Sequence, residues 1–283
     1  MTFHALSLEA REVLERAGIS QITAAFDVEI LARHILGWDR AAWLAGRGQE
    51  ASDEFRSRYS ALIARRATRE PVAYIRGVQE FWGRDFEVGP AVLIPRPETE
   101  LVVETVEPFL RDQNALSVVD IGTGSGCLAI TLALEHPNAE VFATDISSEA
   151  LRVARRNASR LGASRVIFRL GAILADIPGP VGLIVSNPPY VAETDRPGLA
   201  PEVRDHEPAT ALYGGEDGLA LIEAILLAAR KALTPGGRLI TEFGYGQDDR
   251  VRQLIATFPE YLLESTVHDL QQIPRVMVVR RVN

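Results

Sequence analysis

The chain has 283 residues, 47% hydrophobic and 24% charged, a composition that indicates a globular protein with a substantial core and excludes a disordered or fibrous one. Its 30 basic and 38 acidic residues give a net charge of −8, which disfavours tight binding to a polyanion such as duplex DNA. No apolar run approaches the ~18 residues that span a bilayer, and the N-terminus has no signal-peptide pattern. We therefore expect a soluble, cytoplasmic protein without membrane contact.

The sequence gives little support for metal, hydrolase or P-loop chemistry. Cys127 is the only cysteine, the five histidines lack ligand spacing, and Ser125 has no evident His and Asp partners for a catalytic triad. Lys231 is the only lysine and lies outside any Gly-rich loop, so a Walker-type P-loop is absent. We expect no metal site.

The N-terminal quarter of the chain is predicted to be a small helical bundle. Apolar residues recur at three- and four-residue steps over residues 8–69, and Asp27, Asp39 and Ser52 are predicted to cap helices. Residues 1–76 carry eleven arginines and ten acidic residues, but no cluster that indicates catalysis. Three of the arginines are interpreted as a solvated helix face, with a docking patch for an acidic partner as the alternative: Arg65, Arg66 and Arg69.

The next segment is predicted to be a hairpin that links two domains. Short β-like runs at residues 72–75, 81–88 and 91–94 are separated by glycines, and residues 98–110 return to a helical period. The expected domains are therefore a helical bundle at 1–70, a hairpin linker at 71–95 and a larger domain at 96–283.

From residue 116 onward, strand patterns alternate with helix patterns, which is typical of a parallel sheet with helices on both faces. The predicted strands are 117–121, 140–144, 165–170, 181–186 and 238–243, and the predicted helices are 126–135, 148–161 and 217–233. The runs 261–268 and 275–280 predict an antiparallel pair at one edge. The expected fold class is α/β, a seven-stranded doubly wound, Rossmann-like sheet plus a small N-terminal helical domain.

A Gly-rich loop lies between the first strand and the first helix of this sheet. It reads Asp-Ile-Gly-Thr-Gly-Ser-Gly from Asp120, and Asp145 ends the next strand 19 residues after the loop, the spacing of an acid that binds a ribose. Cys127 stands where the third Gly of a dinucleotide loop would fall, so the pattern instead resembles the S-adenosylmethionine loop of class I methyltransferases. Asp120 would hold the loop or the methionine ammonium group, or would only cap the loop. The cofactor residues predicted in this part of the chain are Gly122, Thr123, Gly124, Ser125, Gly126 and Asp145.

The second motif, Asn187-Pro188-Pro189-Tyr190, follows the predicted strand 181–186. Loops at the carboxyl ends of the central strands face the ligand in doubly wound sheets, so this loop should face the cofactor. The side-chain oxygen of Asn187 and the carbonyl oxygen of Pro188 can accept the two hydrogens of a planar amide, and Tyr190 can stack on it. A simple strand-terminating turn is the alternative interpretation.

Together these features resemble the peptide chain release factor glutamine methyltransferases (the HemK/PrmC family). The resemblance covers the whole chain, and its most specific part is the nine-residue segment 92–100, Val-Leu-Ile-Pro-Arg-Pro-Glu-Thr-Glu. It is supported by the segments 70–75, 80–83 and 273–275.

The resemblance implies methylation of the side-chain amide nitrogen (N5) of the glutamine in the Gly-Gly-Gln motif of class I release factors. It implies S-adenosylmethionine as cofactor, bound by residues 122–126, Asp145 and Asn187. It also implies Asn187, Pro188 and Tyr190 as catalytic residues, with the glutamine held by Asn187, Pro188, Pro189 and Tyr190. Arg96, Glu98 and Thr99 would line the pocket, unless Glu98 and Thr99 only cap the following helix.

One stretch departs from the family of folds. Residues 170–174, Leu-Gly-Ala-Ile-Leu, lack the acidic or polar side chain that such folds place near the adenine. We therefore expect backbone contacts and apolar packing from Ile173 at this position.

Two other functions remain as alternatives. An amino-methyltransferase acting on adenine or guanine in a nucleic acid would use the same chemistry, but residues 77–283 carry a net charge of −9 and short loops. A non-catalytic nucleoside-binding protein would not need an intact 187–190 motif. Since Gly-Gly-Gln is a short target, a release factor must also be selected by a second surface, and the N-terminal helical domain is the expected docking surface. No direct contact with nucleic acid is expected.

Overall fold

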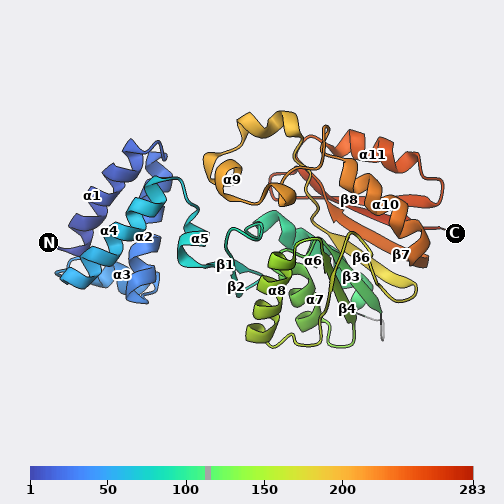
Figure 1. Ribbon diagram of the computed structural model, residues 1–283, viewed down its shortest axis with the longest axis horizontal. Helices are drawn as coiled ribbons and strands as arrows, with labels where there is room; N and C mark the ends of the chain where they lie inside the picture. Colours follow the sequence, from blue (N-terminus) through green and yellow to red (C-terminus); the bar gives the residue numbers. More distant parts are fainter. Residues whose placement is uncertain (112–115, 283) are drawn as a thin grey trace. The chain divides into compact units, whose positions relative to one another are not determined.

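The computed structural model describes residues 1–111 and 116–282. The chain forms two compact units, one made of Met1–Gly77 with Ala200–His206 and the other of Val78–Leu199 with Glu207–Asn283 (Figure 1). Residues 200–206 therefore belong to the first unit, although the residues before and after them along the chain belong to the second.

The first unit is a helical bundle, as the periodicity predicts. Its helices are α1 (Phe3–Arg16), α2 (Gln21–Leu36), α3 (Arg40–Gly46), α4 (Asp53–Ala67), α5 (Val72–Arg76) and, from far along the chain, α9 (Pro201–His206). Asp39 caps α3 by accepting a hydrogen bond from Ala42 N at 2.7 Å, and Ser52 caps α4. The prediction for Asp27 is wrong, because Asp27 lies inside α2 and is buried.

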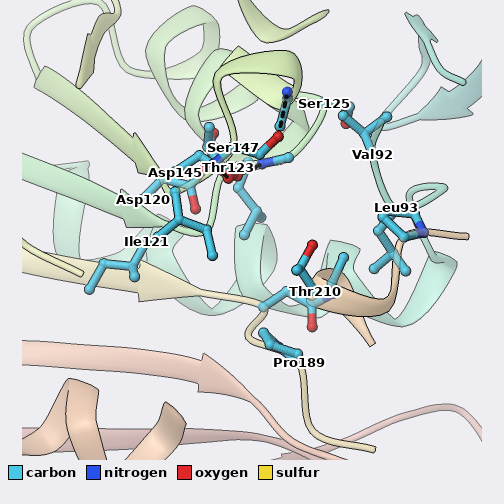
Figure 2. Close-up of a pocket in the computed structure, with 18 of the residues that line it drawn as sticks. Val92, Leu93, Asp120, Ile121, Thr123, Ser125, Asp145, Ser147, Pro189 and Thr210 are labelled. Carbon is cyan, nitrogen blue, oxygen red and sulfur yellow. Dashed lines mark hydrogen bonds between the residues drawn. The ribbon is translucent and has the colours of Figure 1, made fainter. Parts of the chain in front are cut away.

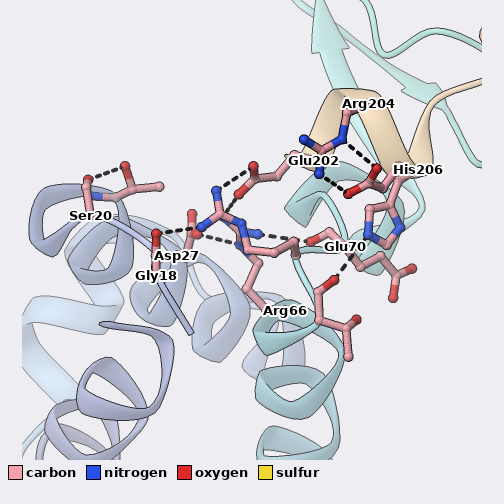
Figure 3. A network of polar contacts seen from close by, with 12 residues as sticks. Gly18, Ser20, Asp27, Arg66, Glu70, Glu202, Arg204 and His206 are labelled. Atoms are coloured by element: carbon pink, nitrogen blue, oxygen red, sulfur yellow. Dashed lines mark hydrogen bonds and ion pairs between the residues drawn. The ribbon is translucent and has the colours of Figure 1, made fainter. Parts of the chain in front are cut away.

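Asp27 belongs to a polar network that holds α9 against α4 (Figure 3). Arg66 on α4 is only 3% exposed, and it donates to Asp27 at 2.7 Å and to Glu202 on α9 at 2.8 Å. Arg69 donates to the other oxygen of Glu202 at 2.7 Å and to the Gly18 carbonyl.

The interpretation of Arg66 and Arg69 as a solvated face is therefore wrong. These arginines are committed to structural ion pairs, whereas Arg65 pairs with Glu70 at the surface.

The predicted strand at 72–75 is also wrong. This run forms the short helix α5, preceded by Pro71 and ended by Gly77 in the left-handed conformation with φ 76°. A short apolar run fits either a strand or a helix, so the periodicity alone does not decide. The hairpin itself is present as β1 (Val78–Phe81) and β2 (Arg84–Glu87), but residues 91–94 form no strand.

The second unit contains the predicted seven-stranded sheet, in the order β5-β4-β3-β6-β7-β9-β8. Its strands are β3 (Ser117–Ile121), β4 (Glu140–Asp145), β5 (Ile167–Leu170), β6 (Val181–Ser186), β7 (Leu233–Glu242), β8 (Tyr261–His268) and β9 (Pro274–Arg281). β3 to β7 are parallel, while β9 pairs antiparallel with both β7 and β8. The doubly wound fold with an antiparallel edge pair is confirmed.

Alternating strand residues build two apolar layers, one on each face of the sheet. Val118 and Val141 face the layer of α6 (Glu100–Leu110), α7 (Cys127–Glu135) and α8 (Ser148–Leu161), whereas Val119 and Phe142 face α10 (Ala220–Ala232) and α11 (Asp248–Ala256). Figure 1 shows these two groups of helices on opposite sides of the strands. Helices α9 and α11 were not expected from the sequence pattern, nor were the short 3-10 turns η1 (Pro97–Thr99), η2 (Glu193–Gly198) and η3 (Ala209–Ala211). Among the described residues, no helix has the length and apolar character needed to cross a bilayer.

The strand order reverses between β3 and β6. The chain runs from β3 outward to β4 and β5, then returns to place β6 on the other side of β3. Ile121 and Ser186, the last residues of these two strands, are paired in register, and Ser186 Oγ donates to the Ile121 carbonyl at 2.8 Å. Ligands of doubly wound sheets bind at such a reversal, beyond the carboxyl ends of the strands.

Candidate active site

The Gly-rich loop after β3 is held by hydrogen bonds to β4 and to Asp120. Gly122 N and Thr123 N both donate to the Thr144 carbonyl at 2.9 Å. Gly122 and Gly124 have φ values of 71° and 56°, a conformation that glycine adopts at little cost. These glycines therefore let the loop turn sharply. At Gly122 the requirement for glycine comes from this backbone conformation and not from crowding, because a Cβ there would meet no atom within 4 Å.

Asp120 caps the Gly-rich loop and the start of α7 with one carboxylate oxygen, while its other oxygen has no hydrogen-bond partner among the described residues. Its Oδ2 accepts hydrogen bonds from Thr123 Oγ1 at 2.6 Å and Ala129 N at 3.2 Å. Its Oδ1 is buried and has no hydrogen-bond partner among the described residues. Because the side chain is only 1% exposed, burial raises the pKa of Asp120 to about 7. A buried acceptor without a partner is costly unless a ligand supplies a donor.

Asp145 ends β4 beside the same loop. One of its oxygens accepts from Gly124 N at 2.9 Å and the other from Ser147 N at 2.8 Å. These bonds fix the carboxylate, and each oxygen retains a lone pair for a further donor. Burial raises the pKa of Asp145 above its ordinary value.

The loop after β6 is anchored at both ends of its motif. Asn187 Nδ2 donates to Thr99 Oγ1 at 2.8 Å, and Tyr190 OH donates to Glu242 Oε1 at 3.0 Å. Gln247 Nε2 donates to the Tyr190 carbonyl at 2.9 Å. Asn187 Oδ1 is buried and, like Asp120 Oδ1, has no partner among the described residues.

One cavity connects the two loops (Figure 2). Its volume is about 1030 Å³ with the open mouth included, which is ample for a nucleoside-sized ligand together with part of a second molecule. The lining residues come from the Gly-rich loop, the ends of β4 and β5, the 187–190 motif and the segments 91–99 and 208–211. The lining residues include Thr99, Asp120, Gly122, Thr123, Gly124, Ser125, Asp145, Gly171, Ala172, Ile173, Asn187 and Pro189.

The cavity therefore contains many, but not all, of the residues predicted for the site. Gly126, Pro188 and Tyr190 are not among its lining residues. A Cβ at Gly126 would lie 2.7 Å from the Ile130 side chain and 3.2 Å from Ala154, so this glycine lets α7 and α8 pack closely. Pro188 is buried.

Of the three residues at 96–99 that were predicted to line the pocket, one lines the cavity and two do not. Thr99 lines the cavity and makes no capping hydrogen bond to α6, so the capping alternative does not hold for its side chain. Arg96 and Glu98 are not lining residues, and Arg96 instead pairs with the buried carboxylate of Glu207. Glu207 also accepts from Ile94 N at 3.1 Å.

Sequence reasoning missed Glu242 and Gln247. Glu242 is 1% exposed at the end of β7, and burial raises its pKa to about 7. A signal was available, because an acidic residue that ends a buried strand of a doubly wound sheet is unexpected unless it has a partner.

The chemistry of the cavity fits S-adenosylmethionine. Asp120 Oδ1 and Asn187 Oδ1 are buried and have no partner among residues 1–111 and 116–282, so both need donors. The carboxyl groups of Asp120 and Asp145 suit a ligand that carries positive charge. Gly171, Ala172 and Ile173 line the cavity with small or apolar groups, as expected for an adenine held by packing and backbone. Among the described residues, no group of three or more His, Cys, Asp or Glu side chains is arranged to hold a metal ion.

Comparisons with known proteins agree with the two units. A PrmC N-terminal domain family matches residues 6–77, and a methyltransferase domain family matches residues 112–272. The release factor glutamine methyltransferase of Koribacter versatilis (strain Ellin345) is 44% identical over 255 residues, which cover 89% of this chain and 90% of that protein. The protein of the same name from Nitratidesulfovibrio vulgaris is 39% identical over 284 residues, or 99% of this chain and 95% of its own.

A solved methyltransferase from Pyrococcus furiosus has the same fold, with a TM-score of 0.55 and 21% identity, over 80% of this chain and all of that one. Two relatives close to 40% identity over almost their full length identify more than the fold. The chain belongs to the family of the release factor glutamine methyltransferases.

Proposed function

We propose that this protein transfers a methyl group from S-adenosylmethionine to the side-chain amide nitrogen (N5) of the glutamine in the Gly-Gly-Gln motif of class I peptide chain release factors. One observation carries the proposal: Asn187 lines the same cavity as the Gly-rich loop, and its side-chain oxygen is buried with no hydrogen-bond partner among the described residues. The names of the relatives support release factor glutamine as the substrate.

The Gly-rich loop and the ends of β3 and β4 would hold the cofactor. Asp120 Oδ1 is the proposed acceptor for its ammonium group, and Asp145 the proposed acceptor for its ribose hydroxyls. The backbone of Gly122 to Gly124 would lie against the methionine part. When bound, the cofactor supplies an electrophilic methyl group on a positively charged sulfur.

The 187–190 motif would hold the substrate amide. Asn187 Oδ1 accepts one N–H of the glutamine and the Pro188 carbonyl accepts the other, which leaves the lone pair of the nitrogen directed at the methyl group. Pro189 and Tyr190 flank the amide. Fixing this orientation in advance contributes up to ~7–11 kcal/mol in well-oriented reactions.

The same two oxygens stabilise the transition state. An amide nitrogen is a weak nucleophile because its lone pair is delocalised, and it gains positive charge as the N–C bond forms. Acceptors fixed beside its two protons interact more strongly as that charge grows, and this difference lowers the barrier. The proton is lost after transfer, so the site requires no general base beforehand.

The substrate class is tested by offering three acceptors in parallel. Purified protein with methyl-labelled cofactor should label a class I release factor and leave ribosomal RNA and DNA unlabelled. Preferred labelling of either nucleic acid would establish the alternative amino-methyltransferase function. Binding of cofactor without labelling of any acceptor would support a non-catalytic protein.

We also propose that the first unit docks the release factor, because the three-residue target alone cannot select one protein. Two large apolar side chains one helical turn apart on α2, Ile22 and Phe26, are 74% and 57% exposed and support an interaction surface there. Since release factors act on ribosomes, the proposed location is the cytoplasm.

A further inference from the structure

Glu242 is a buried carboxylate that contacts one end of the 187–190 motif directly, at Tyr190, and is linked to the other end, Asn187, through Thr99, without lining the cavity. Its Oε2 accepts a hydrogen bond from Thr99 Oγ1 at 2.7 Å, and its Oε1 accepts one from Tyr190 OH at 3.0 Å. Thr99 in turn accepts a hydrogen bond from Asn187 Nδ2 at 2.8 Å. A continuous chain of hydrogen bonds thus runs from Glu242 through Thr99 to Asn187.

The chemistry of these groups determines which atom donates and which accepts in each of these hydrogen bonds. Burial raises the pKa of Glu242 to about 7, so above that pH the group is ionised and only accepts hydrogen bonds. The single proton of the Thr99 hydroxyl then points to Glu242, as the structure has it. Thr99 then has only lone pairs to offer to Asn187, so Asn187 must turn its NH₂ group toward Thr99. As a result, Oδ1 is the atom left for the cavity.

Packing alone does not give this result. The oxygen and the NH₂ group of an amide have nearly the same size, so a pocket that fits one orientation also fits the reversed one. In the reversed orientation, Asn187 would present donors to a substrate group that is itself a donor. The orientation of Asn187 therefore has to be fixed by hydrogen bonding.

We propose that Glu242 is a positioning residue that acts through Thr99 to hold the Asn187 amide with Oδ1 facing the substrate, and that fixes Tyr190 directly. The inference rests on the proposed function for the identity of that substrate. Cooperative polarisation along the chain also makes Asn187 Oδ1 a stronger acceptor. Neither Glu242 nor Thr99 needs to touch the glutamine.

The decisive variants change Thr99. Thr99→Val keeps the shape and removes the hydroxyl, and we expect kcat on release factor to fall about tenfold to a hundredfold while the Kd for S-adenosylhomocysteine changes less than about threefold. Thr99→Ser restores the hydroxyl and should recover most of kcat. Thr105→Val is the matched control, because the hydrogen bond that the structure describes for Thr105 Oγ1 is local, to the Leu101 carbonyl on α6, and kcat should stay at the wild-type value.

Glu242→Gln tests the carboxylate with which the series of hydrogen bonds to Asn187 begins. It places a donor at one of the two oxygen positions and removes the charge, so we expect a lower kcat with an unchanged Kd. If the two residues act as one unit, the double variant Thr99→Val/Glu242→Gln loses no more than the worse single variant. The inference would be overturned if the kcat losses of the two single variants multiplied in the double variant, or if the losses tracked a fall in melting temperature. A Thr99→Val enzyme with normal kcat would overturn it as well.

A second readout does not depend on methyl transfer. The side-chain NH₂ signals of Asn187 in a ¹⁵N–¹H spectrum can be assigned by their loss in Asn187→Ala. We expect them to shift and exchange faster in Thr99→Val, but not in Thr99→Ser or Thr105→Val. If wild-type protein labels no release factor, the proposed function fails while this spectrum still tests the positioning. If wild type labels it and the Asn187 signals stay unmoved in Thr99→Val, only the positioning role fails.

Discussion

Asp120, at the end of β3, and Asn187, in the loop after β6, line the same cavity, and each has one buried side-chain oxygen that finds no hydrogen-bond partner among the described residues. The two strands are neighbours, and Ser186, next to Asn187, donates to the carbonyl of Ile121, next to Asp120. The fold therefore brings Asp120, the proposed acceptor for a cationic cofactor, and Asn187, the proposed acceptor for an amide, to the same cavity. The separate roles of these two oxygens lead to separable predictions.

Asn187→Ala should abolish most turnover and spare cofactor binding. Loss of a fixed group that stabilises transition-state charge costs about 10²–10³-fold in kcat. The Kd for S-adenosylhomocysteine, measured by calorimetry, should stay within about threefold, because Asp120, Asp145 and the loop backbone remain. Asn138→Ala, at an exposed position, is the control. Near-normal kcat in Asn187→Ala would show that the role is assigned to the wrong residue.

Cofactor affinity should rise with pH through Asp120. Burial raises the pKa of Asp120 in the ligand-free fold from 3.8 to about 7, so protonation of this group stabilises the folded protein at low pH, and that stabilisation is lost as pH rises through 7. An ammonium group beside Oδ1 favours the ionised form, so binding should release a proton. The Kd should fall with rising pH, by up to about tenfold per unit below pH 7, and then level off.

S-adenosylhomocysteine is the ligand for this titration because it keeps the ammonium group and lacks the charged sulfur. Asp120→Asn should bind it more weakly and with a flatter pH dependence between pH 6 and 8.5. Asp249→Asn, at an exposed position, should behave as wild type. A wild-type Kd independent of pH, or an equal slope in Asp120→Asn, would remove the proposed ammonium contact.

Arg66 should be critical for the stability of the first unit. Arg66→Met leaves Asp27 buried without its main partner, and breaking a buried ion pair in this way costs about 3–5 kcal/mol in the free energy of unfolding. The double variant Asp27→Leu/Arg66→Met should recover much of that loss, because no unpaired charge stays on α2. Arg65→Ala removes a half-exposed pair and should cost less than about 1 kcal/mol. Thermal unfolding followed by tryptophan fluorescence gives all three values, and equal losses for Arg65→Ala and Arg66→Met would contradict this account.

Much of the fold could be predicted from periodicity, because strand and helix patterns in the sheet domain reflect burial directly. Helix α8 and strand β8 have the predicted bounds, since their apolar spacing agrees with local propensity. Residues 72–75 were predicted wrongly because a short apolar run fits two structures, and Asp27 because its partner lies 39 residues away on another helix.

The candidate site shows the same division between local and distant information. The Gly-rich loop and the 187–190 motif are contiguous, so their residue types indicate their chemistry. The role of Glu242 depends on Thr99, which is 143 residues away, and on Tyr190, which is 52 residues away. No local pattern reports such a partnership.

Docking through the first unit should affect intact release factor and spare short peptides. In Ile22→Ala/Phe26→Ala we expect KM for release factor to rise severalfold, while kcat/KM for a Gly-Gly-Gln peptide stays unchanged, because a peptide never reaches α2. Leu262→Ala removes an exposed apolar side chain from β8 and serves as the control. Equal effects on protein and peptide, or none on either, would refute docking at these residues.

Deleting the first unit would be a poorer test of docking. A fragment that starts at Val78 still contains α9, whose Glu202 would lose both Arg66 and Arg69. Since α9 lies in the segment that follows the 187–190 motif, such a fragment should lose activity on peptide as well as on protein. Point substitutions on the full chain keep the two effects apart.

Peptide mass spectrometry of a treated release factor shows whether the methyl group reaches the amide nitrogen of one glutamine. With wild-type protein and S-adenosylmethionine, fragment ions should place a gain of one methylene unit on the side chain of the Gly-Gly-Gln glutamine. Asn187→Ala should modify the same peptide about 10²–10³-fold more slowly. A methyl group on any other residue, or on the Gly-Gly-Gln glutamine at an equal rate with Asn187→Ala, would contradict the account.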